Sequence, residues 1–341
     1  MCFSTSPDLT RALRYHATGK AAEVLRLESI AGATVGKDEV RIALVMAPIH
    51  PSDLGMIGGT YGRLRQLPAI AGREGLGRVV EAGSGATQFP VGTRVRMPDA
   101  EGTWRESVVA KASALIRVPS TIPAEQACMA FINPPTAILL LQNFVPLQPG
   151  DWIIQNAANS AVGECVIQIA KSLGVHTVNL VRDPAKHNAN LTRLGADLVL
   201  ADDKDAAKTV ASALQGKAPR LALNSIGGPS AITLARSLGD NGTLVTFGGM
   251  PTERIAFPTR EFIFKNITCC GFWMDRWART SPPEAVSALF DRVFALQEKG
   301  VLNMAVDSVH PLGEYAKAIA RAEGYGRNGK VLLSSSADNA A

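Results

Sequence analysis

The pattern of hydrophobic and polar positions changes character along the chain. Between about residues 11 and 127, short β-type runs such as Glu39–Val45 and Leu115–Val118 are separated by clusters of Gly and Pro. Strands are typically this short and are bounded by such turn residues. We therefore expect a β-rich first domain.

From Trp152 onwards, short apolar runs alternate with segments of helical period. The run Trp152–Gln155 is followed by a turn of small residues, the helix-period stretch Val162–Leu173 and a second apolar run, Thr177–Val181. Further strand candidates lie at 198–200, 221–223, 243–247 and 267–273. Strands that alternate with helices predict a parallel sheet with helices on both faces.

The C-terminal part adds an amphipathic helix from about Pro282 to Lys299 and a β-type tail, Lys330–Leu333. A length of 341 residues suits two domains rather than one. Hydrophobic residues make up 46% and charged residues 19%, so both domains can bury a core.

Charge and cysteine content exclude several classes of protein. The net charge of +5 is spread without a basic run, which does not favour nucleic-acid binding, although it suits a polyanionic small ligand. The five cysteines show no Cys-x-x-Cys spacing, so neither a disulfide scaffold nor structural zinc is expected. With no long apolar segment and no cleavable leader, we expect a cytoplasmic protein without a membrane span.

The turn after the run at 152–155 is a candidate nucleotide loop. A dinucleotide fingerprint would place glycines at the positions of Ala158, Ser160 and Gly163, and only the last is Gly. The other two are small, and the Ser hydroxyl can donate to phosphate at a helix N-terminus. An ordinary tight turn between strand and helix would favour the same residues.

The end of the second strand bears on the choice of cofactor. An acidic residue about 20 positions on usually binds the ribose of NAD, whereas Arg182 stands 182 − 158 = 24 positions after Ala158. A cation there suits the 2′-phosphate of NADPH. Asp183 follows directly, so a register change of one residue would reverse the argument, and a surface ion pair between Arg182 and Asp183 is the alternative.

Several segments together resemble the medium-chain dehydrogenase/reductase superfamily, and within it the mitochondrial-type trans-2-enoyl-CoA/acyl-carrier-protein reductases. The resemblance covers nearly the whole chain. The segments that carry it are 52–62, 102–105, 133–137, 155–163, 181–183, 246–250 and 271–273.

The resemblance implies an α/β fold with a GroES-like β-domain and a Rossmann domain, which has a doubly wound parallel sheet. The GroES-like catalytic domain is expected at residues 1–129 and 276–341, and the Rossmann NADPH-binding domain at 130–275. A homodimer joined through the strand near Ile267–Trp273 is also implied. Cys269 and Cys270 on that strand are then small core or interface residues.

Zinc-dependent relatives have a Cys and a His where this chain has Ser52 and Arg73. Zinc prefers thiolate and imidazole ligands, so we expect a zinc-independent enzyme with no metal. The histidines at positions 16, 50, 176, 187 and 310 are expected to be structural or on the surface.

The resemblance implies roles for individual residues. Tyr61 matches the catalytic tyrosine, and Trp104 and Trp273 match the substrate pocket. The chain departs from its relatives at Ala161 and Arg73. The implied cofactor-binding residues are Asn133, Asn159, Ser160, Ala161, Val162, Arg182, Asp183, Phe247, Gly248, Gly249, Met250, Phe272, Trp273, Met274 and Lys330.

The implied activity is reduction by NADPH of the 2,3 double bond of a trans-2-enoyl thioester, carried by CoA or by acyl carrier protein, in fatty acid metabolism. Hydride would go to Cβ, and Tyr61 would give a proton to Cα. One alternative is a zinc-free NADPH reductase of quinones or α,β-unsaturated carbonyl compounds. Another is a non-catalytic NADPH-binding protein.

Overall fold

The computed structural model describes residues 9–249, 254–255 and 258–335. The chain divides into a first unit, made of residues 1–131 and 304–341, and a second unit, residues 132–303. The first unit is therefore built from both ends of the chain, as the resemblance implies.

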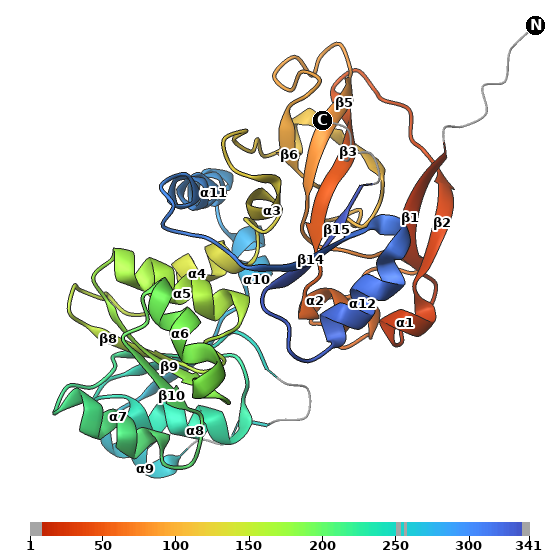
Figure 1. The fold of residues 1–341 in the computed structure, drawn as a ribbon. Helices are drawn as coiled ribbons and strands as arrows, with labels where there is room; N and C mark the ends of the chain where they lie inside the picture. Colours follow the sequence, from red (N-terminus) through yellow and green to blue (C-terminus); the bar gives the residue numbers. More distant parts are fainter. Residues whose placement is uncertain (1–8, 250–253, 256–257, 336–341) are drawn as a thin grey trace, which may run out of the picture. The chain divides into compact units, whose positions relative to one another are not determined.

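Two sheets form the first unit (Figure 1). In the smaller one, β1 (Leu9–Tyr15) pairs antiparallel with β2 (Arg26–Ala31) and β4 (Ala69–Ile70). The larger has the order β14-β15-β3-β5-β6, with β7 also paired to β3. Its strands are β3 (Glu39–Pro48), β5 (Leu76–Ala82), β6 (Arg94–Arg96), β7 (Ser107–Lys111), β14 (Val306–Pro311) and β15 (Lys330–Ser334).

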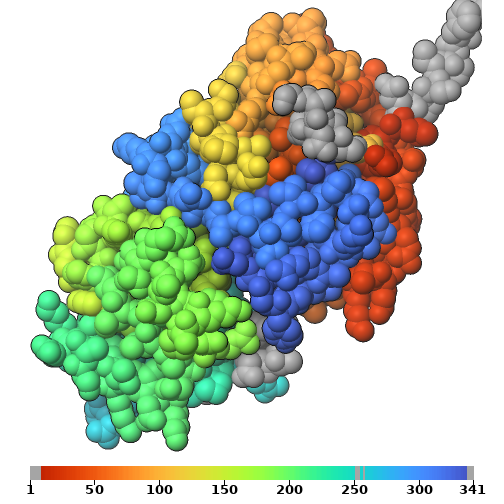
Figure 2. All heavy atoms as spheres, viewed as in Figure 1, coloured from red at the N-terminus to blue at the C-terminus, as the bar shows by residue number. Residues whose placement is uncertain are grey.

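The C-terminal strands complete this sheet. Strand β15 pairs antiparallel with β3, and β14 lies parallel to β15. Helix α12 (Tyr315–Glu323) packs near α1 (Ala21–Val24), so the blue C-terminal segment covers part of the red N-terminal one (Figures 1 and 2). Tyr15, Trp104 and Val331 share the apolar core beneath them. The β-rich GroES-like unit is thus confirmed.

One expected strand does not form. The run Leu115–Val118 follows a short 3-10 helix, Ala112–Ala114, and makes only an isolated bridge between Arg117 and Val95. The N–H of Val118 still donates to the carbonyl of Arg94 at 2.9 Å. The segment therefore runs beside β6 but makes only this single bridge to it and does not extend the sheet.

A six-stranded, all-parallel sheet forms the second unit, in the order β10-β9-β8-β11-β12-β13. Numbered along the chain, this is the order 3-2-1-4-5-6 of doubly wound dinucleotide-binding sheets. The expected Rossmann domain is confirmed, and each strand begins and ends within two residues of its predicted bounds. The strands are β8 (Trp152–Gln155), β9 (His176–Val181), β10 (Leu198–Ala201), β11 (Leu221–Asn224), β12 (Thr243–Thr246) and β13 (Thr268–Gly271).

Helices cover both faces of this sheet because alternate strand residues point to opposite sides. Leu180 packs in an apolar cluster with α7 and α8, whereas the next residue, Val181, packs in another cluster with α5 and α6. The helices of the unit are α4 (Asn133–Gln142), α5 (Ala161–Ser172), α6 (Pro184–Leu194), α7 (Ala206–Leu214), α8 (Gly228–Ser237), α9 (Thr259–Phe264), α10 (Met274–Thr280) and α11 (Pro283–Glu298).

The boundary between the units differs from the expected one at the C-terminal return, which lies at 303/304 instead of 275/276. Helix α11 explains the difference. It buries Phe290 and Phe294, and the guanidinium of Arg292 donates to the side-chain carbonyl of Gln142 on α4 at 2.6 Å. The amphipathic helix therefore belongs to the Rossmann unit. No helix in the described ranges could span a bilayer.

Candidate active site

Tyr61 follows a short helix whose start is fixed by local hydrogen bonds. Helix α2 (Pro51–Ile57) begins with Pro, and the carboxylate of Asp53 accepts from the N–H of His50 at 2.7 Å, as in a capping box. The chain then turns through Gly59, whose φ of 78° favours glycine. Tyr61 is half-buried just beyond this turn.

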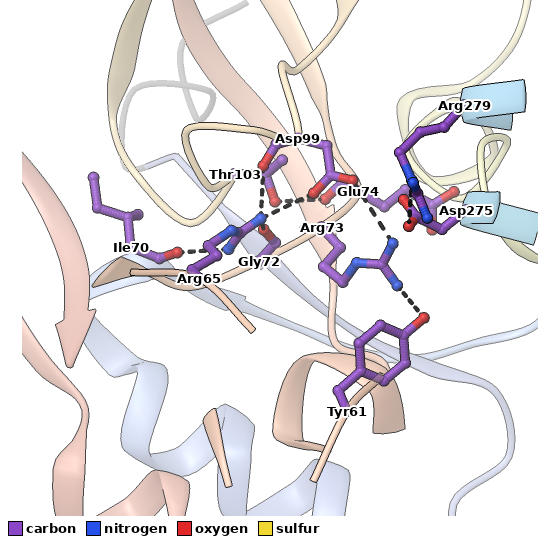
Figure 3. A network of polar contacts seen from close by, with 10 residues as sticks. All are labelled: Tyr61, Arg65, Ile70, Gly72, Arg73, Glu74, Asp99, Thr103, Asp275 and Arg279. Atoms are coloured by element: carbon purple, nitrogen blue, oxygen red, sulfur yellow. Dashed lines mark hydrogen bonds and ion pairs between the residues drawn. The ribbon is translucent and has the colours of Figure 1, made fainter. Parts of the chain in front are cut away.

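The hydroxyl of Tyr61 is held by a cation. Arg73 Nη1 donates to Tyr61 Oη at 2.5 Å, and the guanidinium carbon lies 4.8 Å from the centre of the ring (Figure 3). The Arg73 side chain is 8% exposed. A nearly buried guanidinium therefore contacts both the oxygen and the ring of the tyrosine expected to be catalytic.

A second arginine, Arg65, binds the carboxylate that also contacts Arg73. Arg65 donates to the side chain of Asp99 at 2.9 Å, and to the backbone carbonyls of Ile70, Gly72 and Asp99 at 2.6–2.8 Å. Asp99 Oδ2 lies 3.7 Å from Arg73 Nη2. The Asp99 carboxylate thus lies between two guanidinium groups (Figure 3).

A buried row of three polar side chains lies in the same unit. Lys330 Nζ is 3.0 Å from His50 Nδ1, and His50 Nε2 is 2.5 Å from a Glu74 oxygen. The other Glu74 oxygen accepts from the N–H of Phe131. Since an ammonium only donates, His50 Nδ1 accepts from Lys330 and Nε2–H donates to Glu74. Lys330, expected at the cofactor, is thereby joined to a carboxylate with no exposed surface.

The positions where relatives bind zinc do not fit a metal here. Arg73 has no lone pair to offer, and its guanidinium is engaged by Tyr61 and Asp99. Within the described ranges, no three His, Cys, Asp or Glu side chains are grouped as metal ligands.

Trp104 packs in the hydrophobic core of the first unit. It has no exposed surface, and its indole N–H points to the carbonyl of Pro48 at 3.4 Å. An added Cβ at Gly72 would lie 2.4 Å from the ring, so the indole fills this space tightly. Trp104 therefore does not support the substrate-pocket role that the resemblance implied.

In the Rossmann unit, the candidate nucleotide loop leads directly into α5. Ser160 is its N-cap and accepts from the N–H of Gly163 at 3.1 Å. A Cβ at Gly163 would lie 2.5 Å from the carbonyl oxygen of Ala158, so this glycine allows the close packing of helix on strand. Asn159, Ala161 and Val162 lie around the helix start, where backbone N–H groups favour an anion.

Arg182 and Asp183, which follow β9, make different contacts. Asp183 is the N-cap of α6 and accepts from the N–H of Lys186 at 3.2 Å. Arg182 is exposed, and its side chain makes no hydrogen bond or ion pair with another described residue. The ion pair between the two neighbours, considered as the alternative, is not formed among these residues.

A network of buried amides, which the sequence did not indicate, lies at the carboxyl edge of the sheet. The Asn156 side chain donates to Asn224 Oδ1 at 2.8 Å and accepts from the N–H of Ser225 at 2.8 Å. Ser230, also bonded to Asn156, donates to Asp202 at 2.6 Å. Burial and the neighbouring Asp203 raise the pKa of Asp202, with the Ser230 bond opposing them. The network links the ends of three strands, β8, β10 and β11.

Other expected cofactor residues lie on the same unit. Asn133 opens α4 and is 5% exposed, and its Nδ2 has no hydrogen-bond partner among the described residues. Such a buried amide fits a contact to a bound ligand. Phe247, Gly248 and Gly249 follow β12, and Phe272, Trp273 and Met274 follow β13. Met250 lies outside the described residues.

Glu164, in the first turn of α5, gives a pH-dependent prediction. Burial raises its pKa to about 7, although Asn190 donates to it at 3.0 Å. The folded state therefore holds a proton that the unfolded state releases near its usual pKa, so stability falls as pH rises from about 4.5 to about 7. We expect Glu164→Gln to raise the melting temperature by a few degrees at pH 8 and to change it little at pH 4.5.

Thermal unfolding across this pH range tests the point. Asp291→Asn, at an exposed position of α11 in the same unit, serves as the comparison. An equal effect of Glu164→Gln at both pH values would contradict the assignment.

Comparisons with known proteins agree with this architecture. Residues 36–120 match the alcohol dehydrogenase GroES-like domain, and residues 161–292 match the zinc-binding dehydrogenase family. The chain is 38% identical to the mitochondrial enoyl-[acyl-carrier-protein] reductase of Dictyostelium discoideum over 97% of this chain and 95% of that protein. It is 40% identical to the human mitochondrial enzyme over 93% of this chain and 86% of that protein.

Solved structures show the same fold. The complex of Etr1p, a 2-enoyl thioester reductase of Candida tropicalis, with NADP and crotonyl-CoA has a TM-score of 0.88 and 28% identity, and the match covers 96% of this chain and 100% of that one. A mycobacterial quinone oxidoreductase has a TM-score of 0.82 and 26% identity, covering 95% of this chain and 99% of that one.

The two units and these matches define a medium-chain dehydrogenase/reductase. Within that superfamily, the chain belongs to the family of the mitochondrial enoyl-[acyl-carrier-protein] reductases. The expectation of an oxidoreductase acting on CH–CH bonds is confirmed, and that of NADPH as cofactor is confirmed at the level of the family, since a structure of the group holds NADP.

The expected cytoplasmic location is contradicted by the names of these relatives, which are mitochondrial proteins. An apolar segment is not the signal for this compartment, because mitochondrial targeting segments are amphipathic and rich in Arg and Ser.

Proposed function

We propose that this protein reduces the 2,3 double bond of trans-2-enoyl thioesters with NADPH, as part of fatty acid metabolism. The observation that carries the proposal is Tyr61, which is half-buried in its glycine loop with its hydroxyl bonded to Arg73. The kinship with enoyl-[acyl-carrier-protein] reductases supports the substrate class, since the Etr1p structure was solved with crotonyl-CoA.

The Rossmann unit offers the groups that would hold the cofactor. The start of α5 would bind the pyrophosphate, Arg182 the 2′-phosphate, and the residues after β12 and β13 the nicotinamide half. In the first unit, Lys330 would be a further contact. When bound, NADPH supplies the hydride that goes to Cβ of the substrate.

Hydride addition leaves negative charge on the thioester oxygen and a carbanion character at Cα. Tyr61 can donate because a phenol carries an O–H group. We propose that its O–H bond breaks as the proton moves to Cα, and that the phenolate regains a proton from water. No metal is needed, because positioned donors stabilise the enolate.

The route of the hydride provides a direct test. With NADPH deuterated at the transferred position, the saturated product should carry deuterium at Cβ and none at Cα, as read by mass spectrometry and NMR. In deuterated water the label should appear at Cα instead. Deuterium from the cofactor at Cα would contradict the proposed chemistry.

Arg182 should set the preference for NADPH. A charge-assisted hydrogen bond contributes about 1.5–3 kcal/mol, so Arg182→Ala should raise the KM for NADPH roughly 10- to 100-fold. The KM for NADH, which lacks the 2′-phosphate, should stay within about twofold. Steady-state kinetics with both cofactors measure this.

Arg193→Ala is a matched control because it removes the same charge near the other end of α6. It should leave both KM values unchanged. A similar rise for NADPH in both variants would show a general charge effect and not recognition of the phosphate.

A quinone or α,β-unsaturated carbonyl reductase is the second candidate, favoured by the likeness to the mycobacterial quinone oxidoreductase. It predicts turnover that does not depend on Tyr61. A non-catalytic NADPH-binding protein predicts binding without any turnover.

We also propose that the protein is a homodimer and that acyl carrier protein can present the substrate. Among the described residues, β13 is paired only with β12 and ends the sheet, so its outer edge is open to a second copy. Light scattering of the purified protein tests the dimer. A monomer at micromolar concentration would contradict it.

A further inference from the structure

In the hydrogen bond between Arg73 and Tyr61, Arg73 is the donor. A phenol can both donate and accept, whereas a guanidinium only donates. At 2.5 Å from Arg73 Nη1, Tyr61 Oη is therefore the acceptor, and its own hydrogen points away from Arg73. The contact fixes the tyrosine as a donor toward another group.

The charge of Arg73 also favours the state that follows proton transfer. Its side chain is 8% exposed, and the guanidinium carbon lies 4.8 Å from the ring. A hydrogen bond from a cation to an oxygen strengthens when that oxygen becomes negative, more so where water is largely excluded. Arg73 is thus placed to stabilise the tyrosine oxygen as it loses its proton.

The Asp99 carboxylate is shared unequally between the two arginines. It lies 2.9 Å from Arg65 but 3.7 Å from Arg73. Arg65 is in turn fixed by three backbone carbonyls. The closer contact with Asp99 therefore belongs to Arg65, and Arg73 makes its short bond to Tyr61 (Figure 3).

We propose that Arg73 is the positioning residue of the reaction: it orients the Tyr61 hydroxyl toward the substrate and stabilises the oxygen that gives up the proton. This inference rests on the proposed role of Tyr61 as donor. It also gives a function to the cation that replaces the zinc-binding side chain at this position.

A double-mutant cycle tests the inference. Arg73→Met keeps most of the length of the side chain but removes the donor and the charge, and loss of a charged hydrogen bond should lower kcat roughly 10- to 100-fold. The KM for NADPH should stay within about twofold, because Arg73 acts on the chemical step and not on cofactor binding. In a Tyr61→Phe background, the same substitution should lower kcat by less than about twofold.

A solvent isotope effect separates a positioning role from a structural one. In Arg73→Met, proton donation should limit the rate more strongly, so the ratio of kcat in light and heavy water should rise above that of the native enzyme. Arg73→Lys keeps a charged donor and should recover part of the lost kcat. Should Arg73→Met fail to fold, the cycle with Arg73→Lys decides in the same way.

The outcomes distinguish the two proposals. If Tyr61→Phe is slow but Arg73→Met or Arg73→Lys costs as much in the Tyr61→Phe background as in the native protein, the inference is overturned while the proposed function stands. If Tyr61→Phe alone leaves kcat within about twofold, the proposed donor is wrong and the inference falls with it.

Discussion

Replacing Tyr61 by Phe should lower kcat/KM for an enoyl-CoA by about 10²-fold or more, because a positioned general acid typically contributes that much. Phenylalanine keeps the aromatic ring, whose centre lies 4.8 Å from the guanidinium carbon of Arg73, so the loop should keep its shape. Only the proton donor is removed. NADPH affinity should therefore be unchanged, as measured by fluorescence titration beside the steady-state rates.

Tyr315→Phe is the matched control. It makes the same chemical change at a hydroxyl that donates to the carbonyl of Leu25 at 3.3 Å, next to the core of the first unit. Its kcat/KM should equal that of the native protein. A full rate in Tyr61→Phe, or an equal loss in both variants, would contradict the assignment of Tyr61.

Replacing Glu74 by Ala should destabilise the fold by about 3–5 kcal/mol, as expected when one partner of a buried ion network is removed. Glu74 has no exposed surface and accepts from His50 and from the N–H of Phe131. Without the carboxylate, both lose their acceptor, and the positive charge of Lys330 loses its buried counterion. Denaturant unfolding measures the change.

The conservative variant Glu74→Gln should cost less, because an amide keeps the shape and one oxygen. Glu81→Ala removes a carboxylate of an exposed pair, 2.8 Å from Arg41, and should change stability by about 1 kcal/mol at most. If Glu74→Ala proved no more costly than Glu81→Ala, the buried network would not be a stabilising feature.

The alternation of short apolar runs with helical stretches predicted the parallel sheet to within two residues at the strand ends. Local signals explain this success. Ser160 and Asp183 cap their helices with their own side chains, so each helix start is encoded within a few residues. Caps and apolar periodicity are both properties of neighbouring positions, which a sequence displays directly.

The polar contacts of the first unit could not be predicted in this way. Lys330 and His50 are 280 positions apart, and only the pairing of β15 with β3 brings them together. His50 was expected to be structural or on the surface, and no local pattern distinguishes it from the other histidines. Gly59 signals the turn before Tyr61, but no local pattern indicates that Arg73 is the partner of the tyrosine.

Trp104 is a position where the resemblance and the packing point to different roles. The resemblance implied a substrate pocket, which stays a prediction, and the structure places the side chain in the core beside Gly72. A large aromatic residue can bury its surface in either place, and the packing of the whole unit decides between them.

The rate of NADPH oxidation with trans-2-hexenoyl-CoA, trans-2-decenoyl-CoA and 1,4-naphthoquinone in parallel distinguishes an enoyl thioester reductase from a quinone reductase. The enoyl thioesters should be turned over faster than the quinone, with the saturated acyl-CoA as product by mass spectrometry. Turnover of the quinone alone would contradict the enoyl thioester assignment while leaving the fold and the NADPH site intact.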